Sequence, residues 1–191
     1  MSFALTHLNG FGSITAASSA FGTVRTDALT GSTGGNATVT FRHQFAAAGL
    51  TAPSGTVTQT RVTFHAGTTA GENLTITDAY IGHKGAGDAY DFAATPVQIT
   101  FDGGNAGVTI TTDTTKVSDA VNFAWDKTSD IVISTFYNTS GADACKNLTG
   151  LSNVNQYTKV ANDAATVDAT GYSGPTAGRI EAITKIETDG F

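Results

Sequence analysis

The sequence is poor in charged residues and contains only one cysteine. Charged residues make up 14% of its 191 residues, whereas about 25% is typical of a globular protein. The polar surface must therefore be built largely from Thr, Ser, Asn and Gly. The single cysteine, Cys145, excludes an intramolecular disulfide bond. We interpret it as a small buried apolar residue and not as a nucleophile.

Basic residues are also few. Ten lysines and arginines are scattered along a chain whose net charge is −6. Attraction to nucleic-acid phosphates requires clustered basic side chains, so we expect no nucleic-acid partner.

Long apolar runs are missing. No segment approaches the roughly 20 apolar residues of a membrane-spanning helix, so we expect no membrane association. Residues 1–22 lack the basic leader and unbroken apolar run of a signal peptide. The expectation is synthesis in a cytoplasm without a signal peptide, which is compatible with action outside a cell within a particle.

Motifs of known hydrolytic sites are missing as well. The sequence contains no Gly-Asp-Ser block, no late Asp-x-x-His pair and no G-x-S-x-G elbow. A nucleophile needs a positioned base, and all four histidines lie in the first half of the chain. We therefore expect a non-enzymatic protein without catalytic residues.

Neither a metal nor a cofactor is expected. His65 and His83 can be combined with nearby aspartates, but the spacing matches no compact metal-binding signature. The aspartates considered are Asp78, Asp88 and Asp91. The FDGGNAG segment (101–107) lacks the D-x-D-x-D-G series of a calcium loop, and a tight hairpin turn explains it better.

Alternation of apolar and polar residues is the dominant pattern that is present. It predicts strands in 37–45, 56–66, 72–82, 96–101, 107–112, 121–125 and 130–137. Residues 178–188 fit either a strand with a bulge or a short helix. Glycine- and threonine-rich turns separate these runs. The pattern predicts an all-β fold: an antiparallel, jelly-roll-like β-sandwich with Gly/Thr-rich loops.

The domain organisation follows from where the alternation is strong. Residues 36–191 are predicted to form the β-sandwich domain. Residues 1–35 are weakly periodic, and they are expected to be either an N-terminal arm that docks on a neighbour or a first strand with a loop. Residues 140–165 are the least periodic internal stretch, which we interpret as a long loop with one short helix.

Residues 56–138 carry a resemblance to a known family. The order of the segments TRVTFHAG, ENLTITDAYIGHKGAGDAYDF, TPVQITFDGGNAGVTI and KVSDAVNFAWDKTSDIVISTFY resembles the accessory β-sandwich that precedes the catalytic domain of some SGNH (GDSL-type) hydrolases. The matching positions are Arg61, Leu74, Ile76, Gly82, Phe101, Gly103, Ser118, Asp119, Phe123, Ile131 and Ser134. The resemblance implies a β-sandwich fold. It implies no activity, because the nucleophile block of those hydrolases is missing.

Free-standing domains of this kind also resemble proteins of tailed phages and related particles. The hypothesis is a non-enzymatic virion structural protein, such as a head decoration, spike or fibre component. Its expected partners are other virion proteins or copies of itself, and its expected location is the virion. The alternative is a carbohydrate-binding module that contacts host-surface glycans, and an esterase ranks last.

Aromatic residues near loops or strand ends are the candidate ligand or interface residues. They are Trp125, Tyr80, Tyr90 and Tyr137, with Phe92, Tyr157 and Tyr172 in similar places. Trp125 shares its parity with Val121 and Phe123, which favours a place in the core. The polar turn that follows it favours the alternative, a platform on which a sugar ring stacks.

Overall fold

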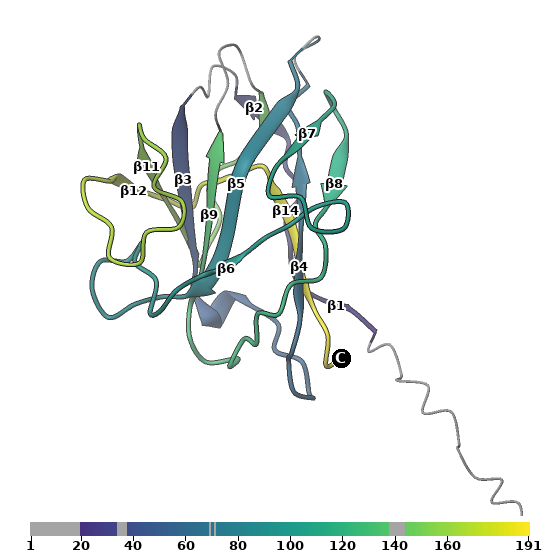
Figure 1. Ribbon diagram of the computed structural model, residues 1–191, viewed down its shortest axis with the longest axis vertical. Coiled ribbons are helices and arrows are strands. Elements are labelled where there is room, and N and C mark those ends of the chain that lie inside the picture. Colours follow the sequence, from purple (N-terminus) through teal and green to yellow (C-terminus); the bar gives the residue numbers. More distant parts are fainter. Residues whose placement is uncertain (1–19, 34–37, 69, 71, 138–143) are drawn as a thin grey trace, which may run out of the picture.

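Antiparallel strands form two layers that pack face to face (Figure 1). This computed structural model describes residues 20–33, 38–68, 70, 72–137 and 144–191. Within these residues the fold is all-β and sandwich-like, which confirms the fold class that the alternation predicts. The one helical element among the described residues is a 3-10 turn, η1 (Ala47–Gly49). No helix in the described part of the chain is long and apolar enough to cross a membrane.

The larger sheet has the strand order β12-β11-β3-β9-β5-β6, and β7 pairs with β5 beside β6. Its strands are β12 (Ser173–Ala177), β11 (Val154–Lys159), β3 (Val39–Phe45), β9 (Ile131–Tyr137), β5 (Leu74–His83), β6 (Val97–Gln98) and β7 (Val108–Ile110). Every residue of β9 is buried. This agrees with its central place and with its apolar start on both faces.

The smaller sheet has the order β1-β14-β4-β8. Its strands are β1 (Gly22–Thr26), β14 (Ile183–Thr188), β4 (Thr60–His65) and β8 (Thr115–Val117). Burial alternates strictly along β4, because one of its faces meets the larger sheet and the other faces outward. A third, short sheet joins β13 (Ile180–Glu181), β10 (Cys145–Leu148) and β2 (Gly31–Thr33).

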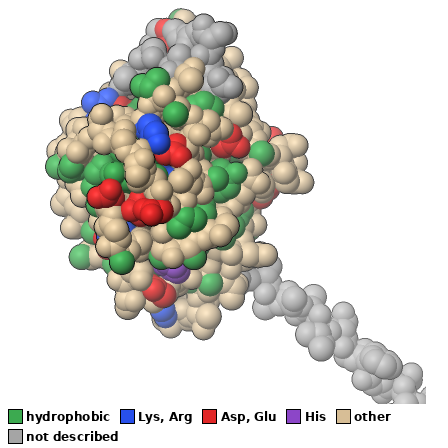
Figure 2. Space-filling view, turned by 60° about the vertical axis from the view of Figure 1, so that its left-hand side comes forward, with side chains coloured by type: hydrophobic (Ala, Val, Ile, Leu, Met, Phe, Trp, Pro, Cys, Tyr) green, Lys and Arg blue, Asp and Glu red, His purple; other side chains and the backbone are tan. Residues whose placement is uncertain are grey.

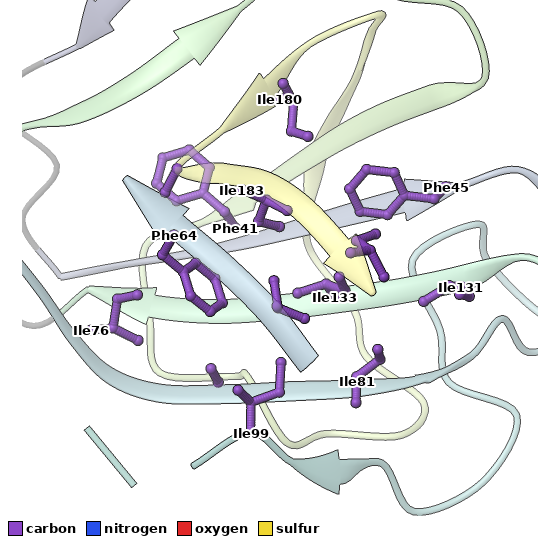
Figure 3. Close-up of a cluster of buried hydrophobic side chains, with 14 of the residues drawn as sticks. Phe41, Phe45, Phe64, Ile76, Ile81, Ile99, Ile131, Ile133, Ile180 and Ile183 are labelled. Carbon is purple, nitrogen blue, oxygen red and sulfur yellow. The ribbon is translucent and has the colours of Figure 1, made fainter. Parts of the chain in front are cut away.

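Side chains from both sheets fill the space between them. Figure 3 shows Phe64 from β4 and Ile183 from β14 lying over side chains of β3, β9 and β5. The Phe64 ring packs 5.8 Å from the ring of Phe101. The chain passes from one sheet to the other between β3 and β4, β4 and β5, β7 and β8, and β8 and β9. These crossings give the sandwich its jelly-roll-like character.

Two predicted segments differ from the structure. Residues 121–125 form no strand, and only Val121 makes a bridge, to Thr60. Their apolar side chains still point inward, because an extended segment can line a core without a partner strand. Residues 140–165 were expected to be a loop with a short helix, but their described part contains β10 and β11. Polar residues on both faces of β11 hide its alternation.

The first strand of the described residues pairs with the last. β1 pairs with β14, and β2 pairs with β10, so the described part of the N-terminal segment contributes two strands. The rest of that segment, residues 1–19 and 34–35, lies outside the described residues. Residues 178–188 take the bulged form, because β13 and β14 are separated at Ala182, whose φ is 61°.

Candidate functional site

One row of side chains crosses the outer face of the larger sheet. Tyr157 pairs with Arg42, Arg42 with Ser134, and Ser134 with Tyr80. Residues directly opposite each other in an antiparallel ladder point to the same face. The odd-numbered residues of β3 point to the opposite face from Arg42. Two of them, Phe41 and Phe45, lie in the core between the sheets. The row therefore faces away from the smaller sheet.

Two loops cover this row. They are the 84–96 loop, between β5 and β6, and the 160–172 loop, between β11 and β12. Both lie at the left of the sheet in Figure 1, and the backbone N–H of Phe92 donates to the carbonyl of Val167 at 3.0 Å. Phe92 packs directly on Gly82, where an added Cβ would lie 2.7 Å from its ring. A glycine at this position of β5 is therefore required for the loop to approach the sheet.

Arg42 binds both loops at once. Its side chain is fully buried, and its guanidinium donates to the carbonyl of Tyr90 at 2.7 Å. It also donates to two carbonyls of the 160–172 loop, those of Asp163 at 2.7 Å and Thr166 at 2.6 Å. The guanidinium carbon lies 4.7 Å from the ring centre of Phe92 and 5.1 Å from that of Tyr172. One side chain thus holds the loops to each other and to the sheet.

Three tyrosines gather above this arginine, and we call them the tyrosine cluster: Tyr90, Tyr157 and Tyr172. The ring centres of Tyr90 and Tyr157 lie 5.2 Å apart, nearly edge to face. Those of Tyr90 and Tyr172 lie 4.8 Å apart. Tyr157 is buried, whereas Tyr90 and Tyr172 are half-buried. The cluster thus has a fixed base and two partly exposed rings.

Acidic side chains surround the cluster. The Tyr90 hydroxyl donates to Asp88 Oδ2 at 2.8 Å, and this hydrogen bond, with some burial, raises the pKa of Tyr90 to about 12. Burial raises the pKa of Tyr172 above its usual value, although the charge of Arg42 opposes the shift. Burial alone would raise the pKa of Asp163, but hydrogen bonds from Lys159 and Thr166 hold it below its usual value. The tyrosines therefore stay neutral and the aspartate charged near neutral pH.

The face around the cluster mixes two kinds of side chain. Figure 2 brings this side of the molecule forward and shows acidic and hydrophobic side chains interspersed on it. Partly exposed aromatic rings beside carboxylates and hydroxyls can contact the C–H faces and hydroxyls of a sugar, or a protein surface. The tyrosine cluster and its surroundings are therefore suited to binding a sugar or a protein surface.

The predicted aromatic candidates fall into two groups. Trp125 is 2% exposed, and its indole N–H donates to the carbonyl of Ser129 at 2.9 Å. Tyr137 is fully buried, with its ring 5.2 Å from that of Phe41. Both lie in the core between the sheets and offer no ring face to a ligand. Tyr80 and Tyr90 lie on the outer side of the larger sheet, Tyr80 within the row and Tyr90 in the cluster.

Sequence reasoning missed Arg42. A lone arginine at an alternating position of a strand is usually a solvated side chain, and the sequence gives no sign that loops will cover it. The loops themselves carry a signal, since Tyr90 and Tyr172 each lie near Gly and Asp residues typical of turns. Which loops meet above which strand depends on strand order, which that signal does not contain.

Of the residues considered as metal ligands, Asp88 and Asp91 lie together, with the N–H of Asp88 donating to Asp91 Oδ2 at 2.8 Å, whereas the two histidines and Asp78 have other partners. His65 Nδ1 contacts the carbonyl of Ala66, whereas His83 lies beside Asp126. Asp78 accepts a hydrogen bond from Asn162. In the part of the chain that the structure describes, no group of three or more His, Cys, Asp or Glu side chains is placed to hold a metal ion.

The FDGGNAG segment forms a hairpin turn. The N–H of Phe101 donates to the carbonyl of Asn105, and Asp119 accepts the N–H groups of Gly103 and Gly104. The three residues between Phe101 and Asn105 all have positive φ values, 50° for Asp102, 80° for Gly103 and 116° for Gly104, a conformation that glycine and aspartate adopt more readily than most residues. The carboxylate of Asp119 therefore holds the turn, and that of Asp102, within the segment, pairs with Lys116.

Cys145, the first residue of β10, lies beside a cluster of polar side chains at the third sheet. Its Sγ is 3.9 Å from Glu181 Oε2, and the N–H of Glu181 donates to His43 Nε2 at 3.1 Å. Arg179 pairs with the same glutamate. Burial, with the charge of Arg179, lowers the pKa of His43 to about 3, so this imidazole is neutral. Cys145 itself is fully buried, in keeping with a structural cysteine.

Comparison with known proteins does not assign this chain to a family. The chain matches no model of a known protein family and no curated protein. The resemblance to the accessory domain of SGNH hydrolases therefore stays a prediction.

Proposed function

We propose that this protein is a non-enzymatic structural component of a virion of a tailed phage or phage-like particle, in which the β-sandwich contacts other virion proteins or further copies of itself. The observation that carries the proposal is that every basic side chain is already paired within the protein. All ten lysines and arginines make an ion pair or a hydrogen bond within the protein. Little of the surface is therefore offered as unpaired positive charge, and partners would meet mainly hydroxyls, amides, backbone and carboxylates with scattered apolar side chains.

Such a surface suits permanent contacts. Forming an interface orders the side chains that enter it, at a cost of about 0.5–1.5 kcal/mol for each long flexible side chain. Threonine, serine and glycine lose less rotamer freedom than lysine or glutamate. A subunit with few free long side chains can therefore make many modest contacts in a repeated assembly, where multivalency strengthens them.

The loops are also held in single shapes. Asp130 accepts the N–H of Ala47, Asp189 accepts the N–H groups of Thr58 and Gln59, and Asp119 holds the 101–105 turn. Asp126 accepts two further N–H groups in its own turn. A component that must present the same surface in every copy benefits from loops fixed in this way.

Mass spectrometry of particles purified on a density gradient from the source culture tests this proposal. The expected result is that the chain bands with the particles in high copy number and stays with them in high salt. A chain found only in the soluble fraction, with particles in the same preparation free of it, overturns the proposal.

A second candidate function is carbohydrate binding, and the tyrosine cluster favours it. Tyr90 and Tyr172 are half-buried aromatic residues whose rings contact each other, and Asp88 lies within hydrogen-bonding distance of the Tyr90 hydroxyl. Sugar rings pack their C–H faces on aromatic rings while carboxylates accept their hydroxyls. The two functions are compatible, because a virion protein can also contact host-surface glycans.

A glycan array tests this candidate. Binding by the wild-type protein should disappear in Tyr90→Ala and Tyr172→Ala and persist in Phe191→Ala. Phe191 is a matched control, because it is an exposed aromatic residue outside the cluster. An array without signal would rule out carbohydrate binding by this cluster, and so would binding that survives both tyrosine substitutions.

A further inference from the structure

A polar pocket lies at one end of the sandwich, away from the tyrosine cluster. Its volume is about 410 Å³, and its walls come from β1, from the segment around η1 and from the turn that precedes β11. The side chains that matter here are those of Thr23, Arg25, Asp27, Thr51, Ser152 and Asn153. The pocket shares no lining residue with the tyrosine cluster, so the two surfaces can be tested separately.

Backbone hydrogen bonds fix the three walls relative to one another. Thr51 N–H donates to the carbonyl of Val24 at 2.9 Å, which joins the η1 segment to β1. Ala46 N–H donates to the carbonyl of Asn153 at 3.0 Å, which joins it to the turn before β11. The pocket is thus formed in the folded protein and needs no rearrangement to accept a small ligand.

Gly49 allows the turn to approach η1. An added Cβ at Gly49 would lie 2.5 Å from the Cβ of Asn153, which is closer than side-chain carbons approach. Asn153 itself has a φ of 60°, a left-handed conformation that asparagine tolerates better than most residues. These two residues together place the amide of Asn153 in the wall.

The wall formed by β1 carries an ion pair, Arg25–Asp27, with no net charge. Arg25 Nε donates to Asp27 Oδ2 at 2.6 Å, and a second N–H of the guanidinium donates to Oδ1 at 3.1 Å. Each side chain is only 9% exposed, and the guanidinium lies 5.4 Å from the ring centre of Phe45. These two bonds take two of the five N–H donors of an arginine and two of the four lone-pair positions of a carboxylate.

This lining selects the class of ligand. An anion would face Asp27, and a cation would face Arg25, so neither charge is favoured over the other. An apolar ligand would cover the hydroxyls of Thr23, Thr51 and Ser152 without bonding them, which costs free energy. A neutral ligand with many hydroxyls, each both donor and acceptor, matches the lining on every side.

We propose that this pocket binds a neutral saccharide of one or two rings. The pocket volume lies in the lower part of the range of small-molecule sites, about 300–1,000 Å³. Leu151, which is half-buried, supplies the apolar side chain of the lining against which a ring can rest its C–H groups. None of the lining residues is aromatic, so the affinity of one site is weak, and several copies on a particle would bind together.

Amide chemical shifts of the isotope-labelled protein test the proposal, with D-glucose, D-galactose and N-acetyl-D-glucosamine as separate probes. At least one sugar should shift the amides of residues 23–27, 49–51 and 151–153, in a saturable way. Inorganic phosphate should leave these amides unchanged. The absence of saturable shifts with all three sugars overturns the proposal, as does saturable binding of phosphate at the same amides.

Two variants test the lining. Asp27→Asn should abolish the sugar shifts, but it also leaves Arg25 without its charged partner, so a second variant that spares this pair is needed. The double variant Thr51→Val, Ser152→Ala changes only exposed hydroxyls, and loss of two hydrogen bonds should weaken binding by about tenfold. Ser173→Ala, on exposed β12, is the matched control and should bind as wild type.

The same spectra separate this proposal from the tyrosine cluster. Shifts confined to the 84–96 and 160–172 loops overturn the pocket proposal and support the second candidate function. Unchanged affinity in the double variant also overturns it. Neither outcome bears on whether the protein belongs to a virion, which the particle experiment decides.

Discussion

Arg42 should contribute more to stability than any surface arginine of this protein. Its guanidinium makes three hydrogen bonds to loop carbonyls while fully buried. A hydrogen bond that involves a charged group contributes about 1.5–3 kcal/mol, which would give roughly 4–9 kcal/mol for three if they were additive. Burial of the charge offsets several kcal/mol of this. We therefore expect Arg42→Met to lower the free energy of unfolding by about 3 kcal/mol.

Urea unfolding measures this change. Since the slope of the unfolding free energy is about 1–3 kcal/mol/M in urea, the midpoint should fall by roughly 1–3 M. Arg42→Lys keeps the charge but has no planar fork to reach three carbonyls, so it should lie between the wild type and Arg42→Met. Amide exchange should accelerate in the 84–96 and 160–172 loops before it does in β9.

Arg61→Met is the matched control. Arg61 pairs with Glu187, but its side chain is 36% exposed, and surface pairs of this kind contribute about 0–1 kcal/mol. If Arg42→Met were as mild as Arg61→Met and left loop exchange unchanged, the claim that Arg42 holds the loops would be refuted.

Three further predictions concern single side chains. Trp125→Ala should cost ~3–5 kcal/mol, because the ring is buried, and the wild-type fluorescence should be blue-shifted; near-native stability of the variant would contradict burial. His43 should make the free energy of unfolding fall as the pH drops from 6.5 towards 3. The reason is that the imidazole of the unfolded chain binds a proton in this range, whereas the folded imidazole, with its pKa of about 3, does not. The full shift corresponds to about 5 kcal/mol, and His43→Gln should flatten the curve of unfolding free energy against pH. Asp88→Asn should lower the pKa of Tyr90 from about 12 towards its usual value, measured as the difference in tyrosinate absorbance between variant and wild type; an unchanged titration would show that the hydrogen bond is not formed.

Alternation located the strands that line the core. β4 alternates in sequence and in burial, and β9, within the predicted strand 130–137, begins with residues that are apolar on both faces, which suits its central place in the sheet. β8 escaped prediction because Thr115–Val117 is a short, largely exposed edge strand. For β11, polar side chains on the core side, such as Gln156, remove the period of two. Alternation therefore fails where a strand lies at an edge or buries polar groups.

The candidate site could be predicted only in part. Tyr80 and Tyr90 were named from their places near loops and strand ends. Their relation to Arg42 depends on the strand order β11-β3-β9-β5, which brings residues over 70 positions apart in the chain into one row. Trp125 illustrates the opposite case, since its parity alone indicated the core, where the structure places it.

The pocket beside Arg25 could not be predicted from the sequence. Its lining comes from three segments that are distant in the chain, and each segment alone consists of ordinary turn residues. Arg25 lies in β1 and Asp27 directly follows that strand, and a spacing of two favours one face for both side chains, but nothing in that spacing indicates that a turn before β11 will close over them.

Electron cryomicroscopy of particles purified from the source culture tests the central claim most directly. The account predicts density at repeated positions on the particle into which the two-layer sandwich fits, with its Thr- and Gly-rich surface in contact with neighbouring subunits. Particles whose density is fully explained by other proteins, with no position for this sandwich, would contradict it.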